Sequence, residues 1–274
     1  MSMHIIYFSK DRPMQLDLAL KTNQAHLKHA TGSSFVIHKG SNQEYRKAYN
    51  QVSKENPLVT FIEEVNFKED VLMAAAWSDY LMFVVDDTIF TADYDFYKIE
   101  RALRNDLSSV GFSLRLGSNT TYCYPLDIKN DIPDFGRVHY GNICFANWKS
   151  VKVGDFGYPL ELSSSIYQTS LISSILRYGD YNNPNELESL MDNAKKDFPS
   201  TLYFFEDSVA FSNPINKVQT INNNRVGNYG LYKPDILLKM YMGGFRIKNN
   251  FDGFIPNGCH QEVKFSFEYC GVEI

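Results

Sequence analysis

The sequence predicts an α/β fold: a doubly wound, mostly parallel sheet with an elaborated C-terminal half. In residues 1–106, short apolar runs alternate with amphipathic segments over short connections, which is typical of parallel strands joined by helices. After residue 107 this rhythm changes to strand-like runs, helices and one long polar stretch. No internal repeat and no linker rich in Pro, Gly or Ser interrupts the chain, so we expect a single domain over residues 1–274 made of these two halves, 1–106 and 107–274.

The strands of the first half are predicted by apolar runs that end in polar or charged residues. Four such runs occur, at Met3–Ser9, Ser34–Gly40, Pro57–Glu64 and Asp79–Asp87. Helices are expected between and after them: one from Pro13, one from Ser41, one over Phe67–Trp77 and one over Asp93–Asp106. Proline suits the first turn of a helix, and Ser41 followed by Glu44 is a capping-box pattern.

The second half predicts a less regular series of elements. Strands are expected at Ser109–Gly117, Thr120–Ile128, Arg137–Trp148 and, at the end of the chain, Cys259–Tyr269. Helices are expected at Ser163–Gly179, at Asn183–Asp197 with Asn183 as cap and Pro184 in the first turn, and at Lys233–Gly244. The asparagine-rich stretch Phe211–Asn228 is too long and polar for a plain turn, and we interpret it as a functional or mobile loop.

Composition excludes several classes of protein. A net charge of −5 argues against a nucleic-acid-binding surface, which needs a basic stripe. The chain has no apolar run of about 18 residues and no signal-peptide pattern at its start, so we expect no transmembrane segment and a cytoplasmic protein. The cysteines, Cys123, Cys144, Cys259 and Cys270, are widely spaced without a CxxC pair and are expected to be reduced thiols.

Asp86 and Asp87 are the first candidates for a functional site, because they end the most apolar of the predicted strands, in "FVVDDT". Adjacent like charges beside a core repel each other and cost desolvation, and a cation or hydrogen-bond donors are the usual remedy. In doubly wound sheets ligands bind beyond the carboxyl ends of the strands. Ser9, Lys10 and Arg12 follow the first strand and are therefore expected at the same edge.

Carboxylate oxygens are the ligands that Mg²⁺ and Mn²⁺ prefer, and such cations commonly bridge a protein to a diphosphate. Because consecutive residues of a strand point to opposite sides, both aspartates can serve one site only if the chain turns at Asp86. The alternative is a structural turn that the pair merely caps. A metal site and a structural turn are both open on the residues alone.

These residues carry a resemblance to the GT-A glycosyltransferases. "FSKDRP" resembles the start of family-2-like members, and "FVVDDT" stands where they carry the DxD motif. Bacterial members of this type also have segments similar to Phe112–Gly117, Gly154–Leu160, Asn213–Gln219, Asn222–Arg225 and His260–Glu262, so the resemblance covers most of the chain. One departure is Thr88, which stands where a strict DxD motif has its second acid.

The resemblance implies a metal-dependent enzyme that moves a sugar from a UDP- or GDP-sugar to a saccharide acceptor, with inversion. It implies a divalent metal, Mn²⁺ or Mg²⁺, held by Asp87, Asp86 and a late histidine, His260. It also implies that residues 1–106 bind the nucleotide sugar, through Ser9, Lys10, Arg12 and Asp86, while Arg225 contacts a phosphate.

An inverting transfer needs a general base at the acceptor hydroxyl. We expect this base in residues 107–274, the acceptor side of the domain. Asp155, in the glycine- and aromatic-rich segment "GDFGYP", is preferred, and Glu161 is the second candidate. Asp155, beside two glycines, is also an ordinary turn residue, and Arg12 and Lys10 are also ordinary surface charges.

Two other functions remain open. A sugar nucleotidyltransferase has a related sheet, but "FSKDRPMQLD" lacks the glycine-rich loop such enzymes carry after the first strand. A non-catalytic nucleotide- or saccharide-binding protein on the same fold would account for Thr88 and for the uncertain base. Turnover of a donor by a chain with an intact Asp86–Asp87 pair distinguishes the enzyme from the binding protein.

Overall fold

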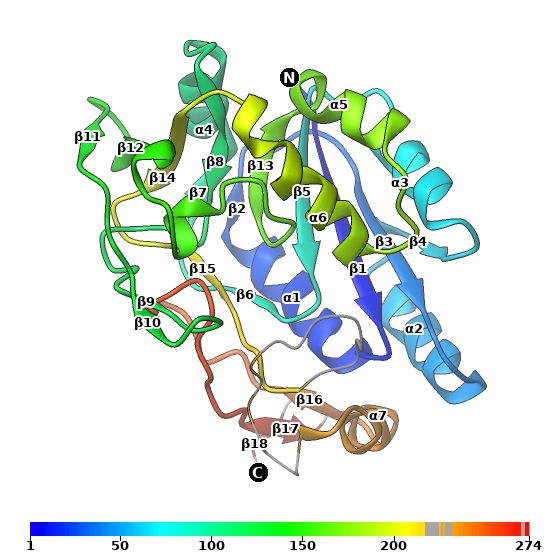
Figure 1. The fold of residues 1–274 in the computed structure, drawn as a ribbon. Helices are drawn as coiled ribbons and strands as arrows, with labels where there is room; N and C mark the ends of the chain where they lie inside the picture. The colour runs from blue at the N-terminus through cyan, green and yellow to red at the C-terminus, as the bar shows by residue number, and fades with distance from the viewer. Residues whose placement is uncertain (217–224, 226, 228–231, 270–271, 274) are drawn as a thin grey trace.

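A nine-stranded sheet forms the centre of the molecule, with helices on both faces (Figure 1). The structure, a computed structural model, describes residues 1–216, 225, 227, 232–269 and 272–273. The sheet contains β1 (Met3–Lys10), β3 (Ser34–Lys39), β4 (Val59–Glu63), β5 (Tyr80–Val85), β8 (Ser109–Ser113), β11 (Phe135–Arg137), β12 (Ile143–Asn147), β13 (Ser165–Gln168) and β14 (Thr201–Phe205). Its strand order is β11-β12-β14-β8-β13-β5-β1-β3-β4. Within it only β12 and β13 run against the others, so the predicted α/β fold with a mostly parallel sheet is confirmed.

The first half follows the predicted order of elements. Its four predicted strands are the parallel neighbours β4, β3, β1 and β5, and the helices of this half are α1 (Pro13–His26), α2 (Gln43–Glu55), α3 (Phe67–Ala75) and α4 (Phe96–Arg104). One detail of the prediction was wrong. The side chain of Asn42, not Ser41, caps α2 by accepting from the backbone N–H groups of Glu44 and Tyr45, because the helix starts one residue later than the capping-box pattern places it.

The largest correction concerns the predicted helix Ser163–Gly179. Only its second part is helical, as α5 (Thr169–Tyr178), which ends at Gly179 as expected. The first part is the strand β13, which lies antiparallel between β5 and β8 in the middle of the sheet. The apolar spacing of this segment also fits a helix. The residues form a strand because they can hydrogen-bond to the otherwise unpaired edges of β5 and β8. The sequence prediction also missed β14 altogether.

The remaining elements are short. They are β2 (Leu27–Lys28), β6 (Thr88–Phe90), β7 (Tyr94–Asp95), β9 (Tyr122–Cys123), β10 (Ile128–Lys129), β15 (Ala210–Ser212), β16 (Phe245–Ile247), β17 (Phe267–Tyr269), β18 (Val272–Glu273), α6 (Pro184–Ala194), α7 (Pro234–Met242) and the 3₁₀ turns η1 (Trp148–Ser150), η2 (Asp155–Gly157) and η3 (Lys195–Asp197). The strand predicted at Thr120–Ile128 is instead the β9–β10 hairpin, because the chain reverses between the two short strands. α6 begins after Asn183 with Pro184 in its first turn, as predicted.

Alternating side chains of the sheet build two separate cores. Along β1, Ile5 and Tyr7 belong to the core under α1, α2, α4 and α7, while Ile6 and Phe8 belong to the core under α3, α5 and α6. Apolar packing on both faces explains why the central strands are almost continuously apolar. It also leaves the strand ends as the places where polar residues gather.

Short strand pairing and hydrogen bonds hold the C-terminal part of the chain beside the end of β5. β15 pairs with β6, which directly follows Asp87, and Ser212 at the end of β15 bridges to His260. The backbone N–H of Asn213 then donates to the Asp87 carbonyl oxygen at 2.8 Å. Beyond Asn216, most of the polar stretch predicted as a functional or mobile loop lies outside the described residues.

Candidate active site

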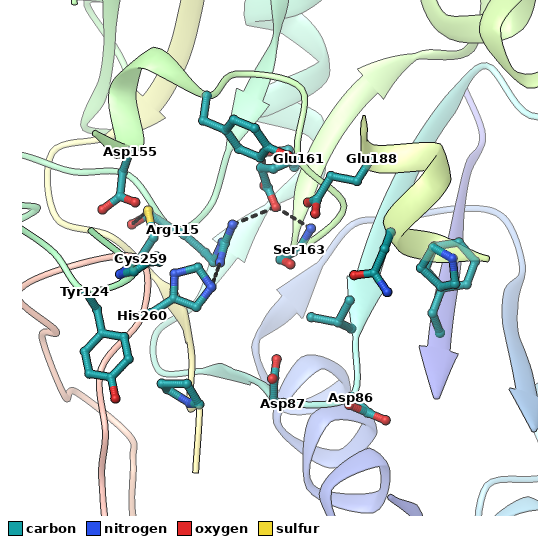
Figure 2. A pocket seen from close by; sticks show the side chains of 18 of the residues that line it. Asp86, Asp87, Arg115, Tyr124, Asp155, Glu161, Ser163, Glu188, Cys259 and His260 are labelled. Carbon is teal, nitrogen blue, oxygen red and sulfur yellow. Dashed lines mark hydrogen bonds and ion pairs between the residues drawn. The ribbon is translucent and has the colours of Figure 1, made fainter. Parts of the chain in front are cut away.

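One cavity lies at the carboxyl end of the parallel strands. Its volume is about 730 Å³, and it reaches from the ends of β1, β3 and β5 to η2 and the start of α6. Every residue that the sequence predicted for the site lines it: Ser9, Lys10, Arg12, Asp86, Asp87, Asp155, Glu161, Arg225 and His260. The fold therefore brings together residues that are far apart in the chain, and Figure 2 shows Asp87, Asp155, Glu161 and His260 around the same space.

The acid pair forms the turn between β5 and β6, as the metal-site hypothesis required. Asp86 is almost fully buried, and each of its carboxylate oxygens accepts one hydrogen bond, from Arg12 Nη1 at 2.9 Å and from Ser9 Oγ at 2.8 Å. Burial above all, and the nearby Asp87, raise the pKa of Asp86 to about 6 against the opposing effect of Arg12. Arg12 is thus the internal cation that holds this pair.

Asp87 is less completely satisfied than its neighbour. Its Oδ2 accepts from Arg12 Nη1 at 3.3 Å, while its Oδ1 is buried and has no hydrogen-bond partner among the described residues. Arg12 itself is held in place by a second bond, from Nη2 to the Asn216 carbonyl oxygen at 2.5 Å. A buried carboxylate oxygen without a partner is costly, and a bound cation would satisfy it.

The unpartnered carboxylate oxygen of Asp87 is a suitable ligand for a hard divalent cation whose other ligands are not protein side chains. Mg²⁺ commonly binds one or two carboxylates and completes its shell with phosphate oxygens and water. Within the described parts of the chain, no group of three or more His, Cys, Asp or Glu side chains is arranged to hold a metal. The predicted set of Asp87, Asp86 and His260 is therefore not assembled as one protein-only metal site.

His260 is occupied by a different partner. Its Nε2 lies 3.4 Å from Arg115 Nη1, which can only donate, so Nε2 accepts and the proton of the neutral ring is on Nδ1. Burial, and then the charge of Arg115, lower the pKa of His260 to about 3. A fixed guanidinium next to Nε2 disfavours a metal at that nitrogen. The Nδ1 atom is buried and has no partner among the described residues.

Arg115 and Glu161 form a second buried ion pair, deeper in the C-terminal half. Arg115 Nη2 donates to Glu161 Oε2 at 2.8 Å, and Arg115 Nη1 donates to Ser212 Oγ at 3.1 Å. Glu161 also accepts from the Ser163 backbone N–H and from Ser165 Oγ. Each oxygen of Glu161 therefore has at least one donor within the protein, and the bonds from Arg115 and Ser163 are drawn in Figure 2.

Asp155 lies at the start of η2, where its position depends on Gly154 and Asn130. Asn130 Nδ2 donates to Asp155 Oδ2 at 2.8 Å, and Cys123 Sγ lies 3.5 Å from Oδ1. Gly154 has a φ of +98°, and a Cβ there would come within 2.3 Å of Asn130 Oδ1. Glycine therefore permits the close approach that orients Asp155 at the cavity wall.

Arg225 borders the cavity but is engaged by the β9–β10 hairpin. Its Nη1 donates to Tyr122 Oη at 2.7 Å and to Asp127 Oδ1 at 2.9 Å, and its guanidinium lies over the Tyr124 ring at 4.5 Å. The side chain is nearly half exposed, so these contacts are weak and easily exchanged for a ligand.

The sequence interpretation missed Glu188, on α6. Its Oε1 accepts from the Leu162 backbone N–H at 3.1 Å, and Figure 2 shows its carboxylate directed into the cavity beside Glu161 and Ser163. Burial above all, and the nearby acids Glu161 and Asp192, together raise the pKa of Glu188 to about 7. The available signal was its place in the second turn of a helix whose cap, Asn183, was correctly predicted.

Comparison with known proteins supports the resemblance seen in the motifs. No model of a known protein family matches the chain. The chain is 28% identical over 209 residues to the bifunctional glycosyltransferase pgtA of Dictyostelium discoideum, a match that spans 67% of this chain and 27% of the relative. The similarity to a curated glycosyltransferase is thus established, while the chain corresponds to only about a quarter of that protein's length.

Solved structures with a similar fold are more distant. TarS residues 1–349 from S. aureus, in complex with UDP, is 12% identical with a TM-score of 0.46, and the match covers 77% of this chain and 59% of that one. The mannosyltransferase PcManGT from Pyrobaculum calidifontis, in complex with GDP-Man and Mn²⁺, is 9% identical with a TM-score of 0.40, covering 74% and 53%. In the part of the chain that the structure describes, no helix is long and apolar enough to cross a membrane.

Proposed function

We propose that this chain transfers a sugar from a nucleoside-diphosphate sugar to a hydroxyl of a saccharide acceptor, with the aid of a divalent metal. Two observations carry the proposal together: the acid pair lines the same cavity as the carboxylates of the C-terminal half, and the buried Oδ1 of Asp87 has no hydrogen-bond partner among the described residues. Similarity to a curated glycosyltransferase supports the same activity.

In this proposal the first half of the chain binds the donor. Lys10, Arg12 and Lys39 supply positive charge at the ends of β1 and β3, where a diphosphate would lie, and Ser9 keeps Asp86 in place through its hydroxyl. Arg225, held loosely at the opposite wall, is the candidate for a further phosphate contact.

Asp87 would hold a Mn²⁺ or Mg²⁺ ion, with Asp86 fixed behind it by Arg12. When bound, such an ion stabilises the negative charge that develops on the departing nucleoside diphosphate. Asp86 then acts through Arg12, since both of its oxygens already accept hydrogen bonds. Its role is to keep the guanidinium and the turn in position.

The second half would bind the acceptor and remove its proton. Direct attack of the acceptor oxygen on the anomeric carbon, opposite the leaving diphosphate, inverts the configuration at that carbon. Carboxylates from this half line the cavity, and the sequence interpretation favoured Asp155 and then Glu161 as the base. Tyr124 and Tyr158 at the same wall offer apolar ring surface for a sugar.

Calorimetric titration of UDP and GDP, each with and without Mn²⁺, tests the donor site. We expect one of the two diphosphates to bind wild type more tightly with Mn²⁺, and we expect this gain to disappear in Asp87→Ala. Asp134→Ala is the matched control, since Asp134 is an exposed aspartate outside the cavity. If neither diphosphate binds under any condition, the acid pair is a structural turn and the saccharide-binding function takes precedence.

A further inference from the structure

We propose that Glu188, on α6, is the general base that removes the proton from the acceptor hydroxyl. The inference rests on the proposed glycosyl transfer and names the residue that would carry out its proton step. It replaces Asp155 and Glu161 as our preferred candidates, on the basis of what each carboxylate contacts.

Glu161 and Asp155 both use their oxygens within the protein. Glu161 accepts from Arg115, from the Ser163 backbone and from Ser165, so a substrate hydroxyl would have to compete with a buried ion pair for it. Both oxygens of Asp155 also face donors, one on Asn130 and one on Cys123. Neither carboxylate has an oxygen that is free of donors from the protein.

Glu188 has such an oxygen. Its Oε1 accepts from the Leu162 N–H. Its Oε2 has no hydrogen-bond partner among the described residues and is not fully buried. The side chain is only half-buried, and it lines the same cavity as the acid pair. One oxygen therefore orients the group and the other is open to a ligand.

The start of α6 places polar groups for a saccharide beside this carboxylate. Asn182, Asn183 and Asn185 line the cavity at the first turn of the helix. Amide side chains both donate and accept, which suits the hydroxyl groups of a sugar. Asn183 also caps α6 by accepting from the Glu186 backbone N–H, so the rigid start of the helix fixes the position of Glu188 one turn later.

The charges around Glu188 come from several elements. Glu161 precedes β13, Arg115 follows β8, Asp192 lies on α6 itself, and the phenols of Tyr158 and Tyr167 lie near it on the segment after η2 and on β13. Burial above all, and then the two acids, raise the pKa of Glu188 to about 7 against the opposing effects of the Leu162 N–H and Arg115. A base whose pKa lies near the working pH is both deprotonated and strong enough to accept a proton.

The step balances without any further reactant. A lone pair of the acceptor oxygen forms the bond to the anomeric carbon as its O–H proton passes to Glu188 Oε2. The bond between that carbon and the phosphate oxygen breaks, and its electron pair leaves with the nucleoside diphosphate. Glu188 then releases the proton to solvent, because its side chain is only partly buried.

Glu188→Gln tests the assignment, with Asp192→Asn as the matched control. Asp192 lies one turn further along α6, pairs with Lys195 at 2.7 Å and does not line the cavity. Release of nucleoside diphosphate is measured from UDP-glucose, UDP-N-acetylglucosamine and GDP-mannose, with saccharide acceptors, from pH 5.5 to about 9. Calorimetric binding of UDP and GDP with Mn²⁺ is measured on the same proteins.

We expect Glu188→Gln to lower kcat about a hundredfold or more while diphosphate binding stays within about twofold of wild type. Wild-type kcat should fall below about pH 7, and the residual rate of the variant should lack this fall. Asp192→Asn should keep the wild-type rate at pH 8 and above, with the fall in kcat moved to lower pH, because Asp192 is one of the acids that raise the pKa of Glu188. A structural role alone would weaken diphosphate binding or unfold the protein without removing the pH dependence.

Two results would overturn the assignment. If wild type transfers sugar and Glu188→Gln is equally active, or if Asp155→Asn alone removes the pH dependence, Glu188 is not the base although the proposed function stands. If wild type binds neither diphosphate and releases none from any donor, the proposed function fails, and the role of Glu188 fails with it.

Discussion

Arg12 and Arg115 line the same cavity, and each is buried against a carboxylate. In both arginines the guanidinium Nε has no hydrogen-bond partner among the described residues, so the two ion-pair clusters, Arg12 with Asp86 and Asp87 and Arg115 with Glu161, are alike in their cations. The clusters differ in how fully their carboxylates are hydrogen-bonded. Every oxygen of Glu161 accepts a hydrogen bond, while Asp87 keeps a buried oxygen that accepts none among the described residues.

This difference separates a structural ion pair from a binding site with the same chemistry. Glu161 and Arg115 have side chains about 5% exposed, and their partners come from the backbone and from neighbouring strands. Asp87 is 18% exposed, and its single bond to Arg12 is long, at 3.3 Å. An incompletely bonded carboxylate is costly in the free protein and is therefore the one that gains when a ligand arrives.

The largest effect is expected from breaking the structural pair. Glu161→Ala leaves Arg115 buried without its counter-ion, and we expect it to lower the free energy of unfolding by about 3–5 kcal/mol. Urea denaturation of the purified variant measures this loss. The double variant Arg115→Met/Glu161→Met, which removes both charges, should regain most of it. A single variant as stable as wild type would contradict the distinction between the two clusters.

A smaller effect follows from the raised pKa of Asp86. Its folded-state pKa of about 6 exceeds the value of 3.8 expected for an unfolded chain, so the folded state holds a proton more tightly than the unfolded state. The resulting stability is fully present below about pH 4 and is lost as the pH rises through 6. Relative to Asp86→Asn, which does not titrate, wild type should lose at most about 3 kcal/mol between pH 4 and pH 7.

Urea denaturation of both proteins across this pH range gives the comparison. Because the other titrating groups are common to both proteins, their contributions cancel in the difference. A difference in unfolding free energy that does not change with pH would show that Asp86 is ionised throughout, and that Arg12 outweighs the cost of burial.

The smallest effect on stability is expected at Asp87. Asp87→Asn removes the repulsion between adjacent carboxylates and keeps an oxygen that can accept from Arg12, so the free energy of unfolding should change by about 0.5 kcal/mol or less. Thermal unfolding without metal checks this. With Mn²⁺ and the diphosphate that binds, the melting temperature of wild type should rise and that of the variant should not. Equal shifts in both proteins would place the metal elsewhere.

The sequence by itself determined the first half of the fold and several residues that line the cavity, although not Glu188. Short apolar runs and helical segments alternate locally there, and strands joined by helices are parallel neighbours, so the position of Asp86, Asp87, Ser9 and Arg12 at one edge followed from order alone. Even Asp155, Glu161 and His260, taken from a resemblance, line the cavity as expected.

The tertiary structure decided what each of these residues does. Ser165–Gln168 becomes β13 because it pairs with both β5 and β8. The local spacing of apolar residues gives no indication that these two strands lack a neighbour. The same insertion brings Ser163 and Ser165 to Glu161, opposite Arg115 from the end of β8.

Hydrogen bonds between residues distant in the chain determine whether a carboxylate is occupied or free. Glu161 meets Arg115 across 46 positions, and Asp86 meets Arg12 across 74. Glu188, on α6, is held at the cavity by a hydrogen bond from the backbone N–H of Leu162. Residue types and spacing reveal which groups can act as acids, bases or ligands. Only the packed chain reveals which of them keeps an oxygen free for a substrate, since that depends on donors supplied from elsewhere in the fold.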